Sequence, residues 1–264
     1  MNDSLIAVIR EAGAIMTGAR DIERGVTAKA GDANFVTAYD SAVQKYLFER
    51  LAALYPDAVF IGEEDSADDF ARLGAGRAFV IDPIDGTTNF IRHFGYSCVS
   101  VALCEVGIPS LGVVFNPFTD EMYCAGAGEG AWVIRRGVRR ALHVSSRPLA
   151  DGVVMAGTSP YYSDLHGSTF AVMRTLFEHS LDLRRSGSAA LDLCRIAEGS
   201  AEVFFELCLS PWDFAAAALI IREAGGTVSR LDGAPLTLDG KCGVLAGNPA
   251  AHREALRLLG SILG

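Results

Sequence analysis

The feature that most constrains this chain is a turn sequence at residues 82–90, which reads DPIDGTTNF and directly follows the apolar run 78–81. The apolar run predicts a buried strand, and the proline and Asp-Gly pair after it predict a turn. The turn sets two carboxylates, Asp82 and Asp85, three positions apart at the end of a strand. A second acidic pair, Glu63-Glu64, also ends an apolar run, at 58–61. Two strand ends that carry acids predict a shared carboxylate cluster.

The charges of such a cluster need to be balanced. Two like charges about 4 Å apart repel by roughly 4 kcal/mol at an effective dielectric constant near 20. Converging carboxylates therefore take up protons or bind cations. Oxygen ligands favour Mg²⁺, Ca²⁺ or Mn²⁺, whereas zinc prefers nitrogen and sulfur. The 5 histidines form no HxxxH pair and the 6 cysteines show no CxxC spacing. Mg²⁺ is the expected ion.

Composition excludes several classes of protein. The chain has 264 residues, 50% of them hydrophobic, which is enough for one large core or two packed ones. Its net charge of -9 argues against nucleic-acid binding, and the paired arginines at 135–136 and 139–140 flank Gly137 in an expected hairpin turn. The chain contains no run of 18 or more apolar residues, so no membrane span is expected. The charged N-terminus is unlike a secretory signal. We therefore expect a cytoplasmic protein with reduced cysteines in its interior.

The order of predicted elements indicates two lobes. Helices are expected at 4–19, 40–54 with Asp40 as N-cap, 168–179, 189–197, 211–224 and 249–259. Strands are expected around 59 and 80, at 99–103, 111–115, 181–183, 201–207, 227–229 and 243–246, with two more between 121 and 138. A glycine-containing loop is expected at 29–34. The antiparallel first part and the alternating second part predict a mixed α/β protein of layered sheets and helices, with an N-terminal lobe at 1–145 and a C-terminal lobe at 146–264.

Four motifs in this order resemble the inositol monophosphatase family of magnesium-dependent, lithium-sensitive phosphatases. They are TAYD at 37–40, GEE at 62–64, DPIDGTT at 82–88 and WD at 212–213. Any one of them is modest evidence, but all four with compatible spacing are specific, and the resemblance runs from about Ile6 to Ala251. It implies the layered αβαβα sandwich typical of sugar phosphatases. Members are commonly homodimers.

The resemblance implies two or three Mg²⁺ ions. Glu63, Asp82 and the carbonyl of Ile84 match the ligands of a first ion. Asp82, Asp85 and Asp213 match those of a second, and Glu63 would help with a weaker third.

The resemblance also implies roles for the residues around these ions. Thr87 and Asp40, with Glu63, match the positions that orient and deprotonate the attacking water, and Lys29 matches a loop lysine beside the weak ion. The amides of Gly86 and Thr87 would receive phosphate oxygens. The substrate-contacting set, which includes the metal ligands Asp85 and Asp213, is completed by Gly187, Ser188, Ala189 and Glu206.

Simpler structural roles compete with these assignments. Asp40 suits a helix cap, and Asp213 in a first helical turn is favoured by the helix dipole in any case. Ser188 is equally compatible with an N-cap for the helix at 189 and with substrate contact. Glu206, on an otherwise apolar strand, would be costly to bury unpaired, which favours a pocket position. Glu64 is expected to be solvated or to support the ligands from outside.

The expected activity is hydrolysis of a small phosphorylated polyol or sugar, with inositol 1-phosphate favoured. No phosphate-loop motif and no serine-hydrolase elbow is present. Fructose 1,6-bisphosphate, histidinol phosphate and nucleotide phosphates remain alternative substrates. Arg184-Arg185 could bind a second phosphate or pair with surface acids. A regulatory protein that binds the transcription machinery, as some bacterial members of the family do, is the alternative from another class.

Overall fold

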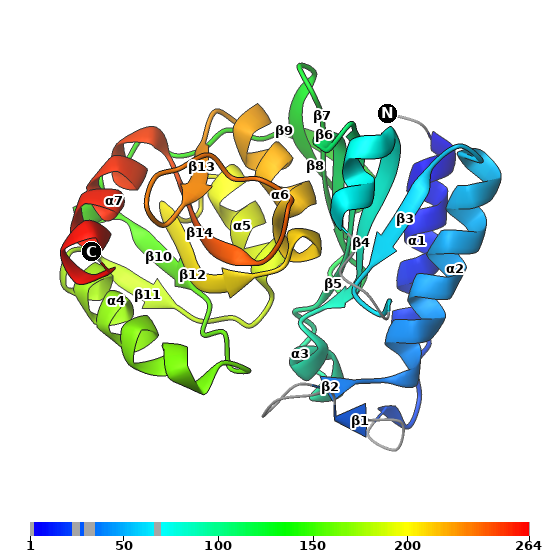
Figure 1. Ribbon diagram of the computed structural model, residues 1–264, viewed down its shortest axis with the longest axis horizontal. Coiled ribbons are helices and arrows are strands. Elements are labelled where there is room, and N and C mark those ends of the chain that lie inside the picture. The colour runs from blue at the N-terminus through cyan, green and yellow to red at the C-terminus, as the bar shows by residue number, and fades with distance from the viewer. Residues whose placement is uncertain (1–2, 23–26, 29–34, 66–69, 264) are drawn as a thin grey trace.

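The computed structural model describes residues 3–22, 27–28, 35–65 and 70–263. Its helices and sheets form five layers, αβαβα, as Figure 1 shows. Helices α1 and α2 form one outer layer, α4 and α7 the other, and α5 and α6 lie between the two sheets. This confirms the predicted layered sandwich. Lys29 and the loop expected at 29–34 lie outside the described residues.

The first sheet belongs to the N-terminal half and has 7 strands in the order β3-β4-β5-β6-β7-β8-β9. Its strands are β3 (Val59–Gly62), β4 (Arg77–Asp85), β5 (Cys98–Glu105), β6 (Ile108–Asn116), β7 (Glu121–Gly126), β8 (Gly130–Arg135) and β9 (Val138–Ala141). In this sheet only β3 and β4 pair in parallel, and the other neighbouring strands are antiparallel. The hairpin turn expected at Gly137 is confirmed, whereas β9 was not predicted.

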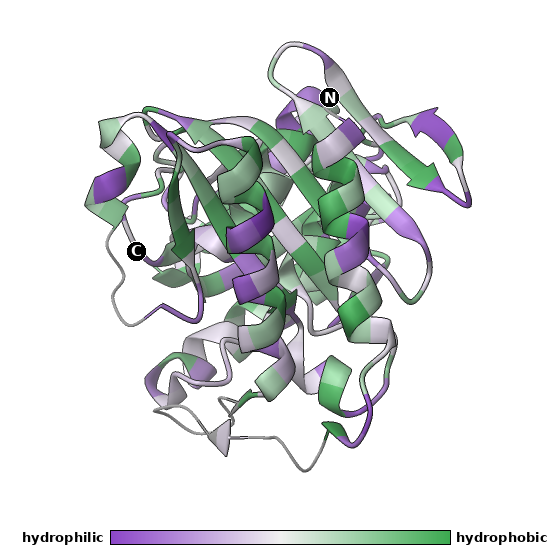
Figure 2. Cartoon of the chain, turned by 90° about the vertical axis from the view of Figure 1, so that its right-hand side faces the viewer, coloured by the Kyte–Doolittle hydropathy of each residue, from purple (hydrophilic) through white to green (hydrophobic). Residues whose placement is uncertain are grey.

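Two helices cover the outer face of this sheet. They are α1 (Asp3–Thr17) and α2 (Ala38–Leu54), whose apolar residues pack on the strands, and Figure 2 looks onto this side of the molecule. The expected N-cap of α2 was wrong by three residues. Thr37, in extended conformation, is the N-cap, and Asp40 lies at the third helical position. The Asp40 side chain accepts from the Thr37 backbone N–H (2.8 Å), so the two residues form a capping box.

The middle layer consists of α5 (Ala189–Ala197) and α6 (Pro211–Glu223), each of which packs on both sheets. The alanine run 215–218 in α6 is buried and allows a close approach to β6. A Cβ at Gly112 in β6 would lie 2.5 Å from the Ala216 carbonyl oxygen. Small residues on both partners therefore set how closely α6 lies against the first sheet.

The second sheet has 5 strands in the order β11-β10-β12-β14-β13. Its strands are β10 (Val153–Ala156), β11 (Asp182–Arg184), β12 (Val203–Leu209), β13 (Thr227–Arg230) and β14 (Cys242–Gly247). Helices α4 (His166–Glu178) and α7 (Pro249–Leu263) cover its outer face. The sheet mixes parallel and antiparallel pairs. Strand β10 was not predicted, because its four apolar residues lie between two glycines and are too short for a periodic signal.

Several short elements complete the chain. They are the strands β1 (Thr27–Ala28) and β2 (Phe35–Val36), the helix α3 (Thr87–Ile91), and the 3₁₀ turns Phe70–Ala75, Leu149–Asp151 and Ser163–Leu165. All 6 cysteines are free and only Cys208 is partly exposed, which confirms interior thiols. Among the described helices, none is both long and apolar enough to span a bilayer. The lobe boundary near residue 145 stays a prediction.

Candidate active site

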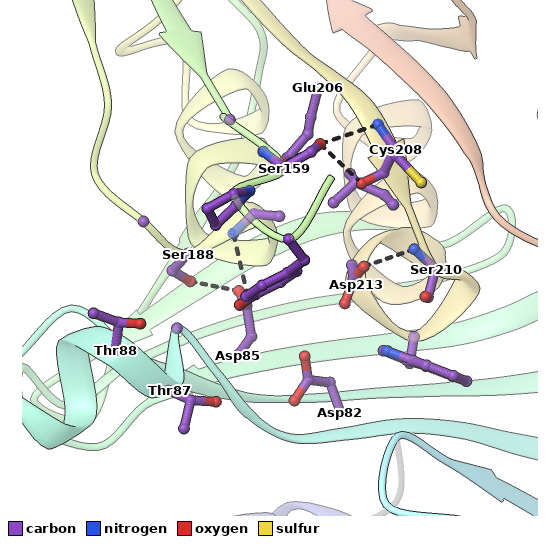
Figure 3. Close-up of a pocket in the computed structure, with 18 of the residues that line it drawn as sticks. Asp82, Asp85, Thr87, Thr88, Ser159, Ser188, Glu206, Cys208, Ser210 and Asp213 are labelled. Atoms are coloured by element: carbon purple, nitrogen blue, oxygen red, sulfur yellow. Dashed lines mark hydrogen bonds between the residues drawn. The ribbon is translucent and has the colours of Figure 1, made fainter. Parts of the chain in front are cut away.

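A cavity of about 390 Å³ is lined by both halves of the chain. Its walls come from the end of β4, the start of α3, the loop after β10, the start of α5, the end of β12 and the start of α6 (Figure 3). The lining includes nearly the whole predicted site: Glu63, Asp82, Ile84, Asp85, Gly86, Thr87, Arg185, Gly187, Ser188, Ala189, Glu206 and Asp213. Residues more than 100 positions apart therefore meet in one cavity.

The end of β4 presents Asp82 and Asp85 to the cavity. Both are buried, at 2% and 8% exposure, and the strand register shifts between them. Gly86 then adopts φ +87°, and a Cβ there would lie 3.0 Å from the Gly187 carbonyl oxygen. Because an L side chain rarely adopts this φ and no space is left for it, the predicted turn depends on glycine.

Asp85 is held by the first turn of α5. Its Oδ2 accepts from the Ala190 N–H (2.8 Å) and from the Ser188 hydroxyl, and its Oδ1 accepts from the Ala189 N–H (3.3 Å). Ser188 is also the N-cap of α5, because its Oγ accepts from the Leu191 N–H. The capping role considered for Ser188 is confirmed, and its hydroxyl also donates to a predicted metal ligand.

Asp213 and Glu63 bring two more carboxylates to the cavity. Asp213 lies in the first turn of α6, where its Oδ2 accepts from the Ser210 N–H (2.7 Å). Glu63 directly follows β3, and its N–H donates to the Ile81 carbonyl (3.2 Å). The predicted strand-end acids and the acid of the WD motif therefore share one site, as Figure 3 shows for Asp82, Asp85 and Asp213.

Burial and mutual repulsion perturb these carboxylates. Burial raises the pKa of Asp82 well above its usual range, and the negative charges of Glu63, Asp85 and Asp213 raise it further. The pKa of Asp213 is raised for the same two reasons. Burial also raises the pKa of Asp85, although the hydrogen bonds from Ser188 and the α5 amides oppose the shift. Carboxylates in this condition bind protons or cations.

The donor set fits Mg²⁺ by its chemistry. All of the candidate ligands are hard oxygens, which Mg²⁺ prefers, and no histidine is among the described residues that line the cavity. Cys208 lines it as well but is not one of the candidate ligands. Within the described part of the chain, no group of three His, Cys, Asp or Glu side chains is already gathered tightly enough to ligate one ion. The carboxylates share the cavity but are oriented by protein donors, as Asp85 is by α5.

Thr87 and Asp40 form a pair at the edge of the carboxylate cluster. The Thr87 hydroxyl lies 3.3 Å from Asp40 Oδ1 and 3.1 Å from the Ile84 carbonyl oxygen. Asp40 is 1% exposed, and burial raises its pKa despite the hydrogen bonds from Thr37. Thr87 lines the cavity and Asp40 does not, so the Thr87 hydroxyl connects Asp40 to the cavity.

Glu206 is buried but hydrogen-bonded. Its Oε1 accepts from the Ser159 N–H (2.8 Å) and hydroxyl (3.2 Å). Burial raises its pKa to about 7, and the bonds from Ser159 oppose the shift. Ser159 adopts φ +39°, so the loop after β10 takes a strained backbone conformation while it supports Glu206.

Sequence reasoning missed one wall of the cavity. Ser159, Tyr161 and Tyr162 come from the loop after the unpredicted strand β10, and Lys241 precedes β14. The available signal was a short apolar run followed by Gly-Thr-Ser-Pro at 157–160, the same strand-then-turn pattern as at β4.

The two neighbouring arginines have different partners. Arg184 pairs with Asp182 (2.5 Å) on the surface. Arg185 lines the cavity and donates to the Thr158 hydroxyl (2.9 and 3.2 Å). Pairing with a surface acid is therefore found for Arg184, and phosphate binding by Arg185 stays a prediction.

Comparison with known proteins agrees with the geometry. The model of the inositol monophosphatase family matches residues 1–262. The chain belongs to the inositol monophosphatase family. It is 36% identical to the Nus factor SuhB of Escherichia coli (strain K12) over 86% of this chain and 82% of that protein. It is 30% identical to the inositol-1-monophosphatase of Bacillus subtilis (strain 168) over 93% and 91%.

The fold of this family member matches solved relatives. The crystal structure of the extragenic suppressor protein suhB from Bartonella henselae superposes with a TM-score of 0.87 at 30% identity, over 97% of each chain. Membership makes this chain part of a phosphatase family that is Mg²⁺-dependent in general. The family prediction made from four short motifs is confirmed.

Proposed function

We propose that this chain is a Mg²⁺-dependent phosphate-monoester hydrolase acting on a small phosphorylated polyol, with inositol 1-phosphate as the favoured substrate. The observation that carries the proposal is the meeting of Glu63, Asp82, Asp85 and Asp213 in one cavity beside the Thr87–Asp40 pair. Phosphate-monoester hydrolysis is among the slowest uncatalysed reactions. A cluster of carboxylates would repel the negatively charged phosphate, so the cluster can catalyse this reaction only when it binds cations.

The residues around the cluster have separable tasks. Glu63, Asp82, Asp85, Asp213 and the Ile84 carbonyl would hold two or three ions. Bound there, the ions would neutralise the phosphate and lower the pKa of water. The amides of Gly86 and Thr87 would receive phosphate oxygens at the turn after β4.

The Thr87–Asp40 pair would activate water. A hydroxyl can accept from a water molecule while it donates its own proton, and Thr87 lies within reach of Asp40 for that donation. The raised pKa of Asp40 makes its carboxylate a better proton acceptor than an exposed aspartate. Asp40 would thus accept a proton through Thr87 rather than by contact with the substrate.

The far wall of the cavity would recognise the alcohol part of the substrate. Gly187, Ser188, Ala189 and Glu206 line it. Ionised Glu206 would accept from substrate hydroxyls, and Ser159 fixes its orientation.

The decisive experiment is a panel of phosphate esters assayed with and without Mg²⁺ and Li⁺. We expect phosphate release from inositol 1-phosphate that requires Mg²⁺, is inhibited by Li⁺, and is lost in Asp85→Asn. Histidinol phosphate and the 2′- and 3′-nucleotides serve as competing substrates. Turnover of the Asp85→Asn variant at the wild-type rate would refute the ligand assignment.

Arg185 supports fructose 1,6-bisphosphate as a second candidate substrate. Among the described residues, no carboxylate lies within ion-pair distance of its guanidinium, and it is held by the neutral Thr158 at the edge of the cavity. A second phosphate of the substrate could balance it. Arg185→Gln should then lower kcat/KM for the bisphosphate about tenfold more than for inositol 1-phosphate, since one charge-assisted contact contributes about 1.5–3 kcal/mol. Arg184→Gln is the matched control, and equal losses for the two substrates would exclude this role.

Similarity to proteins named Nus factor supports a regulatory role as the candidate from another class. A protein that acts in transcription through binding should retain that binding without catalysis. We would titrate purified bacterial RNA polymerase with the wild type and with Asp85→Asn, and equal affinities in the micromolar range or below would support the role. Absence of binding by both proteins would exclude the regulatory role and leave the phosphatase activity as the proposed function. The expected homodimer and cytoplasmic location stay predictions, and light scattering tests the first.

A further inference from the structure

A ring of hydrogen bonds joins the segment after the β4 turn to the start of α5. Asn89 Nδ2 donates to the Tyr96 carbonyl (2.8 Å) and to the Ser186 carbonyl (2.8 Å). Asp192 Oδ1 accepts from the Tyr96 hydroxyl (3.0 Å) and from the Ser186 hydroxyl. We call these four residues the clasp. Two of its bonds, Asn89–Ser186 and Tyr96–Asp192, connect positions about 100 residues apart in the chain.

Asp192 is the unusual member of the clasp. It is 1% exposed and lies in α5 between Leu191 and Leu193, which are fully buried. A carboxyl group is costly to bury, and an apolar side chain would pack in this position without that cost. The carboxyl group differs from an apolar side chain in that one of its oxygens accepts hydrogen bonds from two hydroxyls.

The clasp acts on the segment that holds Asp85. Residues 186–190 run from the clasp to the donors of Asp85, which are the Ser188 hydroxyl and the amides of Ala189 and Ala190. A shift of this segment would move all three donors together. The donors fix the direction in which the Asp85 carboxylate faces the cavity.

We propose that Asp192 is a positioning residue, which holds Tyr96 and Ser186 on one oxygen and thereby orients Asp85 for the cation and the phosphate ester. The last step rests on the proposed function. Groups that orient metal ligands from outside typically contribute about 10–100-fold to metal affinity or activity.

The test compares three variants of the full chain. Asp192→Asn keeps an oxygen acceptor for both hydroxyls, whereas Asp192→Leu has a similar volume and no acceptor. Leu193→Ala is the matched control, because it loosens the packing of the same helix and leaves the clasp intact. We expect Asp192→Leu to weaken Mg²⁺ binding by about tenfold and to lower kcat by roughly 30-fold, with Asp192→Asn within about threefold of the wild type. Leu193→Ala should lower the unfolding temperature without these losses.

Two readouts do not depend on turnover. Calorimetry with MgCl₂ measures the affinity for the ion, and amide hydrogen exchange measures the order of residues 186–190. If the wild type hydrolyses no phosphate ester, the proposed function fails, while these readouts still decide the role of Asp192. Mg²⁺ affinity of Asp192→Leu equal to the wild type, or exchange at 186–190 equal to that of Leu193→Ala, would overturn the proposal.

Single-donor variants cover the case in which Asp192→Leu does not fold. Tyr96→Phe and Ser186→Ala each remove one bond to Asp192 and leave the carboxyl in place. Each should weaken Mg²⁺ binding about threefold, in line with the loss of one hydrogen bond of the pair. Wild-type Mg²⁺ affinity in both variants would contradict the proposal.

Discussion

Two groups of acidic side chains in this protein differ in how far neighbouring basic side chains neutralise them. In the active-site cavity, Glu63, Asp82, Asp85 and Asp213 repel one another, and burial with this repulsion raises the pKa of Asp82. At the other group, which joins the first sheet to α5, two arginines neutralise two glutamates. Arg195 contacts both Glu198 (3.0 Å) and Glu121 (3.2 Å), and Arg135 also bridges them.

The pKa of Glu198 shifts in the opposite direction to the pKa values of Asp82, Asp85 and Asp213. Burial alone would raise the pKa of Glu198, but its hydrogen bond to Arg135 and the charges of Arg135 and Arg195 lower it overall. The cavity is lined by six carboxylates (Glu63, Asp82, Asp85, Asp192, Glu206 and Asp213) and by two basic residues, Arg185 and Lys241. Acids that the fold itself neutralises serve stability, whereas acids left in excess are available for a cation from solution.

The largest expected effect is that of Asp82→Asn in the active-site group. We expect kcat with Mg²⁺ to fall about 10³-fold, equivalent to about 4 kcal/mol of lost transition-state stabilisation. In EDTA at pH 8 the same variant should be more stable than the wild type by roughly 1–2 kcal/mol, because one repelling charge is gone. Phosphate release and urea unfolding measure the two effects. A variant that loses stability in EDTA would show that repulsion does not dominate this group.

Glu198→Gln should have the reverse profile. It removes the acid that faces Arg135 and Arg195, and breaking a partly buried pair costs about 3 kcal/mol of unfolding free energy. Catalysis per folded molecule should stay at the wild-type level. Arg140→Gln is the control, because Arg140 contacts the same Glu198 (3.2 Å) from an exposed position and should cost less than about 0.5 kcal/mol. Unchanged unfolding of Glu198→Gln would contradict the structural role.

The buried Asp192 is expected to make the stability of the protein depend on pH. Burial raises its pKa to about 7, although its bonds to Ser186 and Tyr96 oppose the shift; the charges of Asp85 and Glu206 add to it. Because the folded state holds this proton more tightly than the unfolded state, the carboxyl costs no stability below about pH 4. Stability is then lost as pH rises toward 7, at up to about 1.4 kcal/mol per pH unit. Asp192→Asn lacks this loss.

The measurement is urea unfolding of the wild type and Asp192→Asn at pH 5 and pH 7. We expect the variant to gain roughly 2 kcal/mol relative to the wild type over this interval. A difference between the two proteins that is the same at both pH values would show that Asp192 is not protonated in the folded state.

The smallest expected effect is the release of protons when Mg²⁺ binds. Since the active-site carboxylates have raised pKa values, Mg²⁺ binding at pH 6.5 should release up to about one proton per chain. Calorimetry in two buffers of different ionisation enthalpy would detect it as a difference in apparent binding heat. Identical heats in both buffers would mean that the carboxylates are already ionised before the ion binds.

Local sequence determined most elements of the fold, though not β9 and β10, and it determined the acidic chemistry of the site. The bounds of α5 were predicted to the residue, and the strand-end acids, the turn at Gly86 and the cap at Ser188 follow from patterns a few residues long. Such patterns act through backbone sterics and hydrogen bonds between near neighbours, so they can be read without the rest of the chain. The cap of α2 was misplaced because Thr37 and Asp40 both suit a cap, and their mutual hydrogen bonds decide between them.

The tertiary structure alone decided which side chains face each other. It placed Arg185 in the cavity, although the adjacent Arg184 pairs with Asp182 on the same strand at the surface. It also brought Asp192 to Tyr96 and Ser188 to Asp85 across about 100 residues. Burial and neighbouring charge, which set the pKa of each acid, depend on these distant contacts, and no local pattern encodes them.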